Sequence, residues 1–167
     1  MIQYVWSFAF YLAIAVVLVF IIGAMLPRDH TAERTITVPA TPETLYTRLA
    51  DFANRPQWIT GLQKVTIEPG GRFYTEFHGS DALRMEIVEL TKPSRIITRI
   101  ADEKLEFGGI WTITIAPLNT SATVTVREDG FVKSPLFRFV SRFIMGHTRT
   151  MDQFLKDLAA QYPQSVS

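Results

Sequence analysis

A run of uncharged residues at the N-terminus constrains this chain more than any other feature. No Asp, Glu, Lys or Arg occurs from Met1 to Pro27, and the stretch from Val5 to Leu26 is almost wholly apolar. As a helix, this stretch would span about 33 Å at about 1.5 Å per residue, which matches a bilayer core of about 30 Å. Tyr4 and Trp6 lie where interfacial aromatic residues are found. We therefore predict a single-pass transmembrane anchor over residues 1–27, which places the protein in the cell membrane.

A cleaved signal peptide is the alternative interpretation of this run. Signal peptides begin with a basic region and carry a shorter apolar core. Here no Lys or Arg precedes the apolar run, the run is too long, and no clear A-x-A cleavage site stands before Pro27. A retained helix is therefore favoured. Arg28 and Arg34 follow it, so the positive-inside rule predicts that the domain behind it is cytoplasmic.

The remaining sequence is long enough for one small domain with its own hydrophobic core. We predict a linker over residues 28–33, a domain over 34–162 and a tail over 163–167. The formal net charge of +1 argues against nucleic acid as a partner. The absence of Cys excludes disulfides, thiolate metal sites and cysteine nucleophiles. The sequence leaves the oligomeric state open.

Hydropathy patterns predict the order of elements in this domain. Residues 34–38 alternate as a strand, and Thr41, Pro42 and Glu43 form a typical helix start with the Thr as cap. A short second helix is predicted over residues 58–62. Six strands with period-two alternation follow, separated by turns. They are predicted over residues 64–68, 72–78, 83–87, 95–100, 110–116 and 122–128.

A second helix start, at Ser134 and Pro135, precedes a helix predicted to run to about Tyr162. Apolar residues recur along it at helical spacing from Leu136 to Leu158. An antiparallel sheet that is hydrophobic on one face must cover that face, and this helix is the only predicted element large enough. The prediction is an α+β helix-grip fold. In this fold a curved antiparallel sheet wraps around a long C-terminal helix, here with one N-terminal transmembrane helix added.

This order of elements resembles the START-like superfamily, also called SRPBCC, which includes polyketide cyclases and lipid-transfer proteins. The resemblance covers roughly residues 34–162, and the opening helices with Trp58 carry part of it. The chain further resembles membrane-anchored bacterial proteins of the polyketide cyclase/dehydrase-like type, through segments 26–30, 107–109, 128–130, 137–139, 146–148 and 151–152. The superfamily implies a cavity between sheet and helix that holds an apolar ligand. It implies no particular reaction, because this fold hosts both enzymes and carriers.

Strand parity predicts which residues line that cavity. Ala122, Val124 and Val126 must point inward, and Glu128 shares their parity. The same rule turns Trp111 inward on the preceding strand. The ligand-binding residues predicted in this way, together with those on the helices, are Trp58, Phe73, Phe77, Met85, Trp111, Val126, Glu128 and His147. Nearly all are apolar, so the cavity suits an apolar or amphiphilic ligand.

Glu128 and His147 are the polar exceptions. A carboxylate and an imidazole that project into one apolar space are able to act as an acid–base pair. The competing interpretation, which we favour, is a core histidine with satisfied hydrogen bonds and a Glu128 that lies at a strand end near water. Both residues are therefore candidates, and no catalytic residue is assigned. Gly146 either opens the cavity or allows close packing of helix on sheet.

Three basic residues of the long helix, Arg138, Arg142 and Arg149, are mixed with Phe139 and Phe143. A solvated helix face is favoured here over contact with anionic lipid headgroups. The three His residues are far apart in the sequence, so no metal site is predicted. No nucleotide-binding or phosphate-binding motif is present, and we predict no cofactor.

The sequence thus predicts a membrane-tethered protein that binds or transfers a lipophilic small molecule, such as a lipid, an isoprenoid or a polyketide-like compound. A ligand-binding protein is favoured over an enzyme. Two alternatives stay open. One is a cyclase or dehydratase that uses Glu128 and His147, and the other is a protein-interaction module with a filled core. An inward acid–base pair would favour the first, and the absence of an internal pocket would favour the second.

Overall fold

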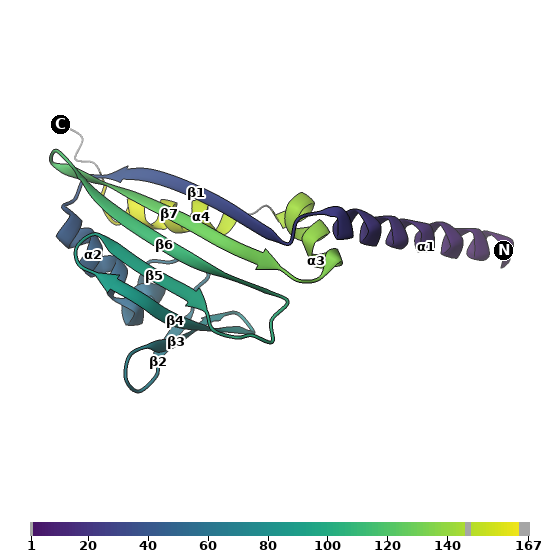
Figure 1. Cartoon of the computed structure of the whole chain (residues 1–167), viewed down its shortest axis with the longest axis horizontal. Coiled ribbons are helices and arrows are strands. Elements are labelled where there is room, and N and C mark those ends of the chain that lie inside the picture. The colour runs from purple at the N-terminus through teal and green to yellow at the C-terminus, as the bar shows by residue number, and fades with distance from the viewer. Residues whose placement is uncertain (1, 146–147, 164–167) are drawn as a thin grey trace.

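The structure is a computed structural model that describes residues 2–145 and 148–163. A long N-terminal helix, α1 (Ile2–Met25), precedes a domain built on a seven-stranded antiparallel sheet with the strand order β1-β7-β6-β5-β4-β3-β2 (Figure 1). The strands are β1 (Asp29–Val38), β2 (Lys64–Ile67), β3 (Phe73–His78), β4 (Asp81–Thr91), β5 (Arg95–Ile100), β6 (Phe107–Leu118) and β7 (Ser121–Val132). The other helical segments are α2 (Pro42–Ala50), a 3₁₀ helix (Phe52–Gln57), α3 (Pro135–Val140), a π-helical turn (Ser141–Met145) and α4 (Arg149–Ala160).

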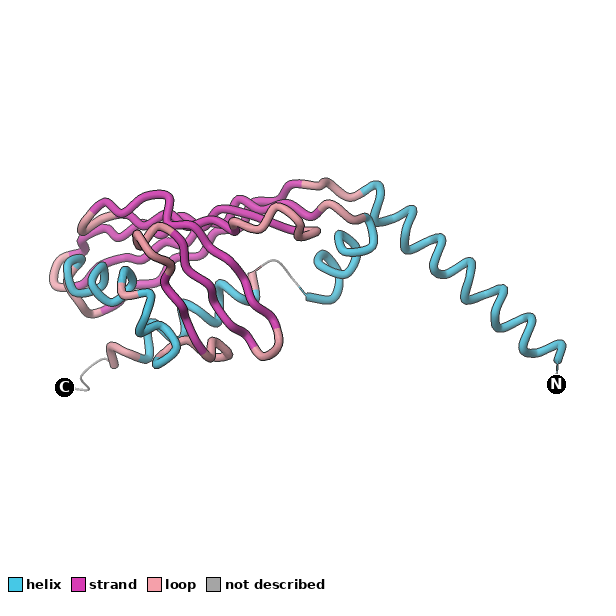
Figure 2. The backbone as a smooth tube through the Cα atoms, turned by 90° about the horizontal axis from the view of Figure 1, so that it is seen from below, coloured by secondary structure: helices cyan, strands magenta, loops and turns pink. Residues whose placement is uncertain are grey.

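The predicted α+β helix-grip class is confirmed. The sheet curves around α4, which lies on its concave side (Figure 2). Met151, Leu155 and Leu158 of α4 are buried in one core cluster with α2 and the centre of the sheet. Burial of this apolar stripe against the sheet is what fixes α4, since a fully buried Leu or Met side chain stabilises a fold by about 1.5–3 kcal/mol.

The single long C-terminal helix is where the prediction is wrong. Pro135 begins a helix as expected, but α3 and the π-helical turn are elements separate from α4. The physical reason is that the apolar residues form two stripes with different partners. The α4 stripe faces the sheet, whereas α3 lies beside the end of α1, away from the core (Figures 1 and 2). Gly146 and His147 lie outside the described residues.

The helices after β1 follow the sequence in part. Thr41 caps α2, because its hydroxyl oxygen accepts a hydrogen bond from the Thr44 amide, and Pro42 begins the helix as predicted. The helix predicted over residues 58–62 is wrong. A 3₁₀ helix stands before it, and the carbonyl of Arg55 accepts the amides of both Trp58 and Ile59. Gly61, at a φ of +83°, then turns the chain away from any helix.

The strand β1 begins earlier than predicted. It pairs with β7 from Asp29, opposite Phe131, to Val38, opposite Ala122. Most of the linker predicted over residues 28–33 is therefore strand, because the backbone of β7 offers hydrogen-bond partners along its whole length. Only residues 26–28 separate α1 from the sheet. The Val132 amide also donates a hydrogen bond to the Arg28 carbonyl. The junction between α1 and the sheet is therefore short and held by a backbone hydrogen bond.

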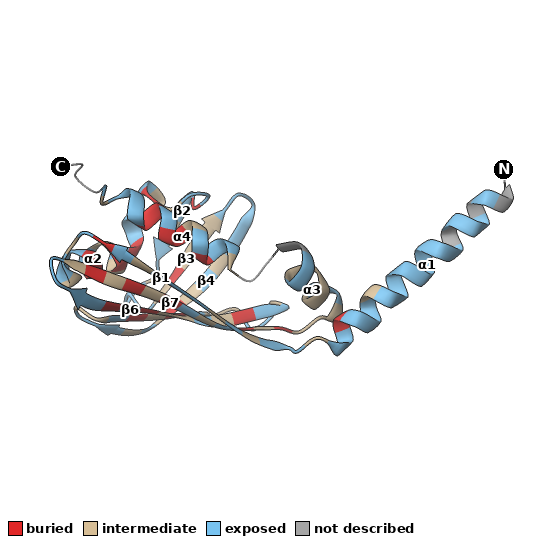
Figure 3. Cartoon of the chain, turned by 90° about the horizontal axis from the view of Figure 1, so that it is seen from above, coloured by how far each residue is buried: buried red, intermediate tan, exposed pale blue. Residues whose placement is uncertain are grey.

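Among the described residues, one helix, α1, is long enough and apolar enough to span a membrane. Its candidate span is Trp6–Met25, with a mean hydropathy of 2.8. Only 6% of this span is buried against the rest of the chain. Figure 3 shows α1 exposed along nearly all its length. The length and composition of α1 also suit a signal sequence.

The strand parity predicted for β3 is wrong. Tyr74 is fully buried and lies opposite Met85 on the inner face, so its neighbour Phe73 and, further along, Phe77 lie on the outer face. There the Arg84 guanidinium lies 4.1 Å from the centroid of Phe73, and the Lys64 amine lies 5.6 Å from that of Phe77. These cations shield the outer rings, which makes the outer position acceptable for Phe.

Tyr74 should dominate the alkaline stability of the fold. Burial raises its pKa to about 12, although nearby Arg55 and Thr98 act to lower it. The unfolded value is about 10, so the unfolded chain loses this proton first and the free energy of unfolding falls between about pH 10 and pH 12, by up to about 3 kcal/mol. Below about pH 10 this contribution is fully present.

The matched variant is Tyr74→Phe, followed by urea unfolding at neutral and alkaline pH. The Tyr74 hydroxyl has no hydrogen-bond partner among the described residues, so its removal at pH 7 should leave stability unchanged or slightly raised. Above pH 10, the free energy of unfolding should decrease less in the variant than in the natural chain. Parallel pH curves for the variant and the natural chain would contradict the assignment.

Candidate ligand-binding site

The inner face of the sheet divides into two parts that differ in burial. Toward α2 and α4 it is closed, with Val38, Ile113, Val124 and Val126 completely or almost completely buried. Toward α1 and α3 most of its residues are only half-buried, although Gly130 and Val132 of β7 are buried. The residues of this second part, which we call the open part, are His30, Ala32, Met85, Ile100, Gly109, Trp111 and Glu128. Ala32, Met85 and Trp111 of the open part pack against the edge of the core and stay partly accessible.

The closed part is filled by aromatic side chains. The Trp58 and Phe154 rings lie 5.5 Å apart, and Phe52 and Tyr74 lie 4.7 Å apart. Arg55 is buried among them, with its guanidinium 4.2 Å above the Phe52 ring and 3.4 Å from a Glu76 carboxylate oxygen. Removal of one partner of such a buried pair would leave a charge uncompensated and would destabilise the fold.

The predicted site residues separate into groups in the structure. Met85, Trp111 and Glu128 lie together on the inner face in the open part. Trp58 and Val126 belong to the filled core instead. Phe73 and Phe77 lie on the outer face and so cannot line a cavity under α4. His147 lies outside the described residues.

Glu128 is the polar centre of the open part. One oxygen of its carboxylate accepts a hydrogen bond from the Trp111 indole Nε1–H at 2.8 Å, and the other lies 3.3 Å from Nε2 of His30. The side chains of His30 and Glu128 keep 18% and 21% of their exposure. The carboxylate therefore orients Trp111 and still stands at the edge of the open part, within reach of a bound molecule.

His30 is the site residue that the sequence interpretation missed. It lies on β1, opposite Gly130 of β7, inside the stretch predicted as linker. Its signal was present in the sequence, since positions 30, 32, 34, 36 and 38 share one parity and the last two are the apolar residues of the predicted strand. Continuing this alternation toward the N-terminus turns His30 inward.

Two glycines form the floor beside this pair. Gly109 and Gly130 lie opposite each other on β6 and β7. A Cβ at Gly130 would stand 2.6 Å from Nε2 of His30, so any larger residue would push the imidazole away from Glu128. The open part thus combines apolar walls, a low backbone floor and one carboxylate–imidazole pair.

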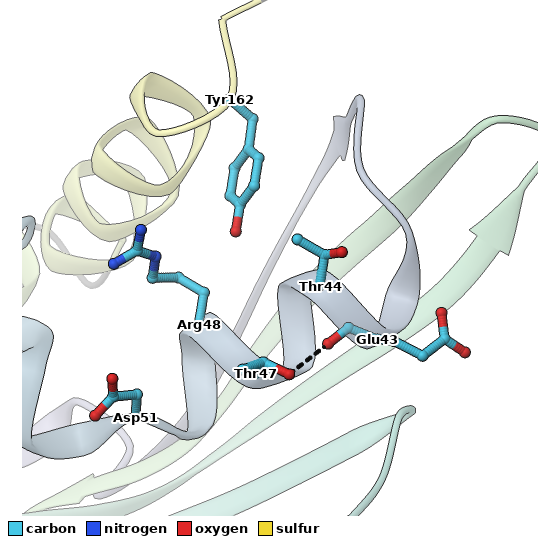
Figure 4. Close-up of a pocket in the computed structure, with 6 residues that line it drawn as sticks. All are labelled: Glu43, Thr44, Thr47, Arg48, Asp51 and Tyr162. Carbon is cyan, nitrogen blue, oxygen red and sulfur yellow. Dashed lines mark hydrogen bonds between the residues drawn. The ribbon is translucent and has the colours of Figure 1, made fainter.

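A second hollow in the described residues lies outside the sheet, between α2 and the end of α4. It has a volume of about 450 Å³ and is lined by Glu43, Thr44, Thr47, Arg48, Asp51 and Tyr162. Figure 4 shows Tyr162 reaching from the end of α4 toward the α2 side chains, with the groove open on one side. Most of its lining residues are exposed, and Arg48 and Tyr162 are half-buried. The hydrogen bond drawn in Figure 4 is internal to α2, from the Thr47 hydroxyl to the Glu43 carbonyl. The described part of the chain contains no cluster of His, Asp and Glu able to hold a metal ion.

A curved antiparallel sheet closed by a C-terminal helix, with a partly open inner face, defines the START-like class of helix-grip proteins. The chain belongs to the family described as polyketide cyclase / dehydrase and lipid transport, whose sequence profile matches residues 29–162. The predicted resemblance to the START-like superfamily and to the polyketide cyclase/dehydrase type is therefore confirmed.

Solved structures show the same fold. A START superfamily protein from Mycobacterium smegmatis is 19% identical, with a TM-score of 0.62, 80% of this chain covered and 97% of that chain. Norcoclaurine synthase from Thalictrum flavum is 13% identical, with a TM-score of 0.64 and coverage of 84% and 90%. The di-domain ARO/CYC protein StfQ of the steffimycin biosynthetic pathway is 15% identical, with a TM-score of 0.65 and coverage of 80% and 50%. No curated protein matches the chain.

Proposed function

We propose that this protein is a membrane-tethered carrier that binds a lipophilic ligand on the open part of the inner face. One observation carries the proposal: the apolar face that the fold must cover is completely covered only over its closed part. Trp111, Met85 and Ile100 are left half-buried beside one polar pair, which is the composition of a site for a large apolar molecule with one polar group.

The anchor supports the same proposal. A helix of the length and hydropathy of α1 would hold the domain at a bilayer, where lipophilic ligands are dissolved. The family description names lipid transport beside cyclase and dehydrase chemistry, and a carrier agrees with the first of these. The cytoplasmic side stays a prediction of the positive-inside rule.

The test is mass spectrometry of small molecules extracted from the full chain after gentle purification from membranes. A fusion of residues 1–27 to an unrelated soluble domain serves as the control, because it retains the annular lipids of α1 alone. We expect one lipophilic compound, or one narrow class, at close to one molecule per chain and absent from the control. The same lipids in the same proportions in both samples would refute the carrier and favour a protein-interaction module.

A cyclase or dehydratase is the second candidate, and the pair of His30 and Glu128 favours it. A carboxylate and an imidazole 3.3 Å apart beside an apolar surface are the groups that general acid–base catalysis uses. In this candidate His30 takes the part that the sequence interpretation gave to His147.

Glu128→Gln separates the two candidates. The amide keeps an oxygen that accepts the Trp111 indole N–H, so the fold should persist. For a carrier, ligand retention should change by about tenfold at most, the value of one neutral hydrogen bond. For an enzyme, the variant should keep its ligand but no longer convert it, since the lost interaction belongs to the transition state. Comparing the masses of compounds extracted from both proteins decides the point.

A further inference from the structure

The segment that leaves the core after β7 has an apolar exposed face. Leu136, Phe137 and Phe143 are each at least half exposed, and Val140 lies between them on the same helical face at i, i+1, i+4 and i+7 spacing. The Phe139 ring packs against the Phe143 ring, with their centroids 4.9 Å apart. A soluble surface rarely gathers several large apolar side chains on one short helix, so this face calls for a partner.

The position of this segment indicates which partner. Val19 and Gly23, one turn apart, are the only described side-chain positions of α1 that are not exposed, and α3 lies against this end of α1. A Cβ on Gly23 would stand 2.0 Å from the Pro135 carbonyl oxygen, so only Gly allows this approach. Val19 precedes Met25 by about 9 Å along the helix, at about 1.5 Å per residue. The apolar face of α3 is therefore continuous with the last turns of α1.

The contact between the two helices is fastened by Arg138. Its guanidinium donates hydrogen bonds to the carbonyls of Leu26, Val132 and Lys133, at 3.3, 2.9 and 2.8 Å. These three carbonyls belong to the end of α1 and the end of β7. The Arg138 guanidinium is therefore turned toward the junction of α1, β7 and α3. The exposed surface of α3 is apolar, and Arg142 follows it in the sequence.

We propose that residues 135–145 form an interfacial membrane element that lies in the headgroup and acyl boundary beside α1. This inference rests on the proposed function, because it takes α1 to span the bilayer. Amphipathic interfacial helices insert by about 5–10 Å, and Gly23, which Pro135 approaches, lies in the last turn of the candidate span. The partner is a lipid surface, and Arg142 meets its phosphates.

This placement sets the open part of the inner face against the membrane. His30 follows the end of α1 closely, and Phe107, which is 43% exposed, lies opposite Val132 at the same end of the sheet. These residues lie between the end of α1 and Trp111, on the route that a lipophilic molecule would take from the bilayer to the site.

The experiment uses the absence of Cys in the natural sequence, so that one introduced Cys carries one environment-sensitive fluorophore. Full chains with Leu136→Cys or Phe143→Cys are labelled in nanodiscs of phosphatidylcholine and phosphatidylglycerol. The lipids carry a spin-label quencher near the headgroup in one set of samples and near the end of the acyl chain, where it reaches position 16, in another. Val16→Cys reports on α1, and Thr114→Cys, exposed on the outer face of β6, reports on the solvated domain. All four positions are exposed in the chain, so labelling should leave the core of the domain intact.

We expect the labels at positions 136 and 143 to be quenched about threefold or more beyond the label at position 114, as for a helix at the acyl boundary. Quenching at position 16 with solvent-like behaviour at both 136 and 143 would overturn this inference and leave the anchor intact. Solvent-like behaviour at position 16 would overturn the anchor of the proposed function, and the interfacial element with it.

Discussion

Ile100→Trp should strip the protein of its bound ligand, with retention lowered at least tenfold, or about 1.4 kcal/mol. Ile100 is half-buried on the inner face of β5, opposite Met85, so a larger ring there occupies the open part. The affinity of a carrier follows apolar contact area at about 25 cal/mol for each Å². An indole that fills the site removes that contact, and its own burial keeps the fold stable. The measurement is the amount of extracted compound per folded chain.

Ile110→Trp is the matched control for this variant. Ile110 is 42% exposed and lies opposite Asp129 and Arg99 on the outer face of the sheet. The same change of Ile to Trp adds the same bulk outside the site, so ligand retention should stay at the natural level. Equal retention by both variants would remove the open part from consideration as the ligand site. A loss in both would indicate damage to the sheet, which thermal unfolding of the two proteins would also show.

The central strands were predictable because their inner face is apolar without interruption. Parity alone placed Ala122, Val124 and Val126 of β7 in the core, and all three are buried. The Thr residues between them point away, which is the alternation of a half-buried antiparallel sheet. The same parity brought Glu128 to the inner face beside Trp111. Local hydropathy was sufficient there because burial and alternation agree.

The strand β3 was not predictable in this way, because both of its faces carry aromatic residues. Phe73 and Phe77 lie on one face of this strand and Tyr74 on the other. Period-two alternation does not say which of these two faces points into the core. Tertiary partners decide the outcome, since Arg84 covers Phe73 from outside while Arg55 meets the inner face. These cations are distant in sequence from the rings that they cover, so a local pattern cannot reveal them.

The break in the C-terminal helix had a similar cause. Leu136 and Phe143 fit a helical stripe as well as Met151 and Leu158 do, and the sequence does not say which surface each stripe meets. The approach of Pro135 to Gly23 assigns the first stripe to the region of α1. A contact between residues more than a hundred positions apart is a property of the fold, so the sequence could predict the apolar residues but not their division.

Removal of residues 1–27 should change the mode of membrane association rather than abolish it. The full chain is expected to stay in the membrane pellet through high salt and alkaline carbonate, because a spanning helix inserts effectively irreversibly. A chain that starts at Arg28 retains all of β1 and the family region 29–162, so it should fold and leave the pellet under the same washes. It should still float with vesicles reversibly, since half-exposed Leu136, Phe137 and Phe143 would each contribute about 1 kcal/mol or more on burial in lipid.

The combined change of Phe137→Ser and Phe143→Ser in the shortened chain isolates this remaining attachment. Both side chains are exposed, so their loss should leave the thermal transition of the domain near its original temperature. Flotation with vesicles of phosphatidylcholine and phosphatidylglycerol should then disappear. The same pair of substitutions in the full chain should not release it from the membrane, because α1 still spans the bilayer. Complete solubility of the full natural chain without detergent would contradict the anchor. Persistent flotation of the shortened double variant would show that another surface of the domain binds the lipid.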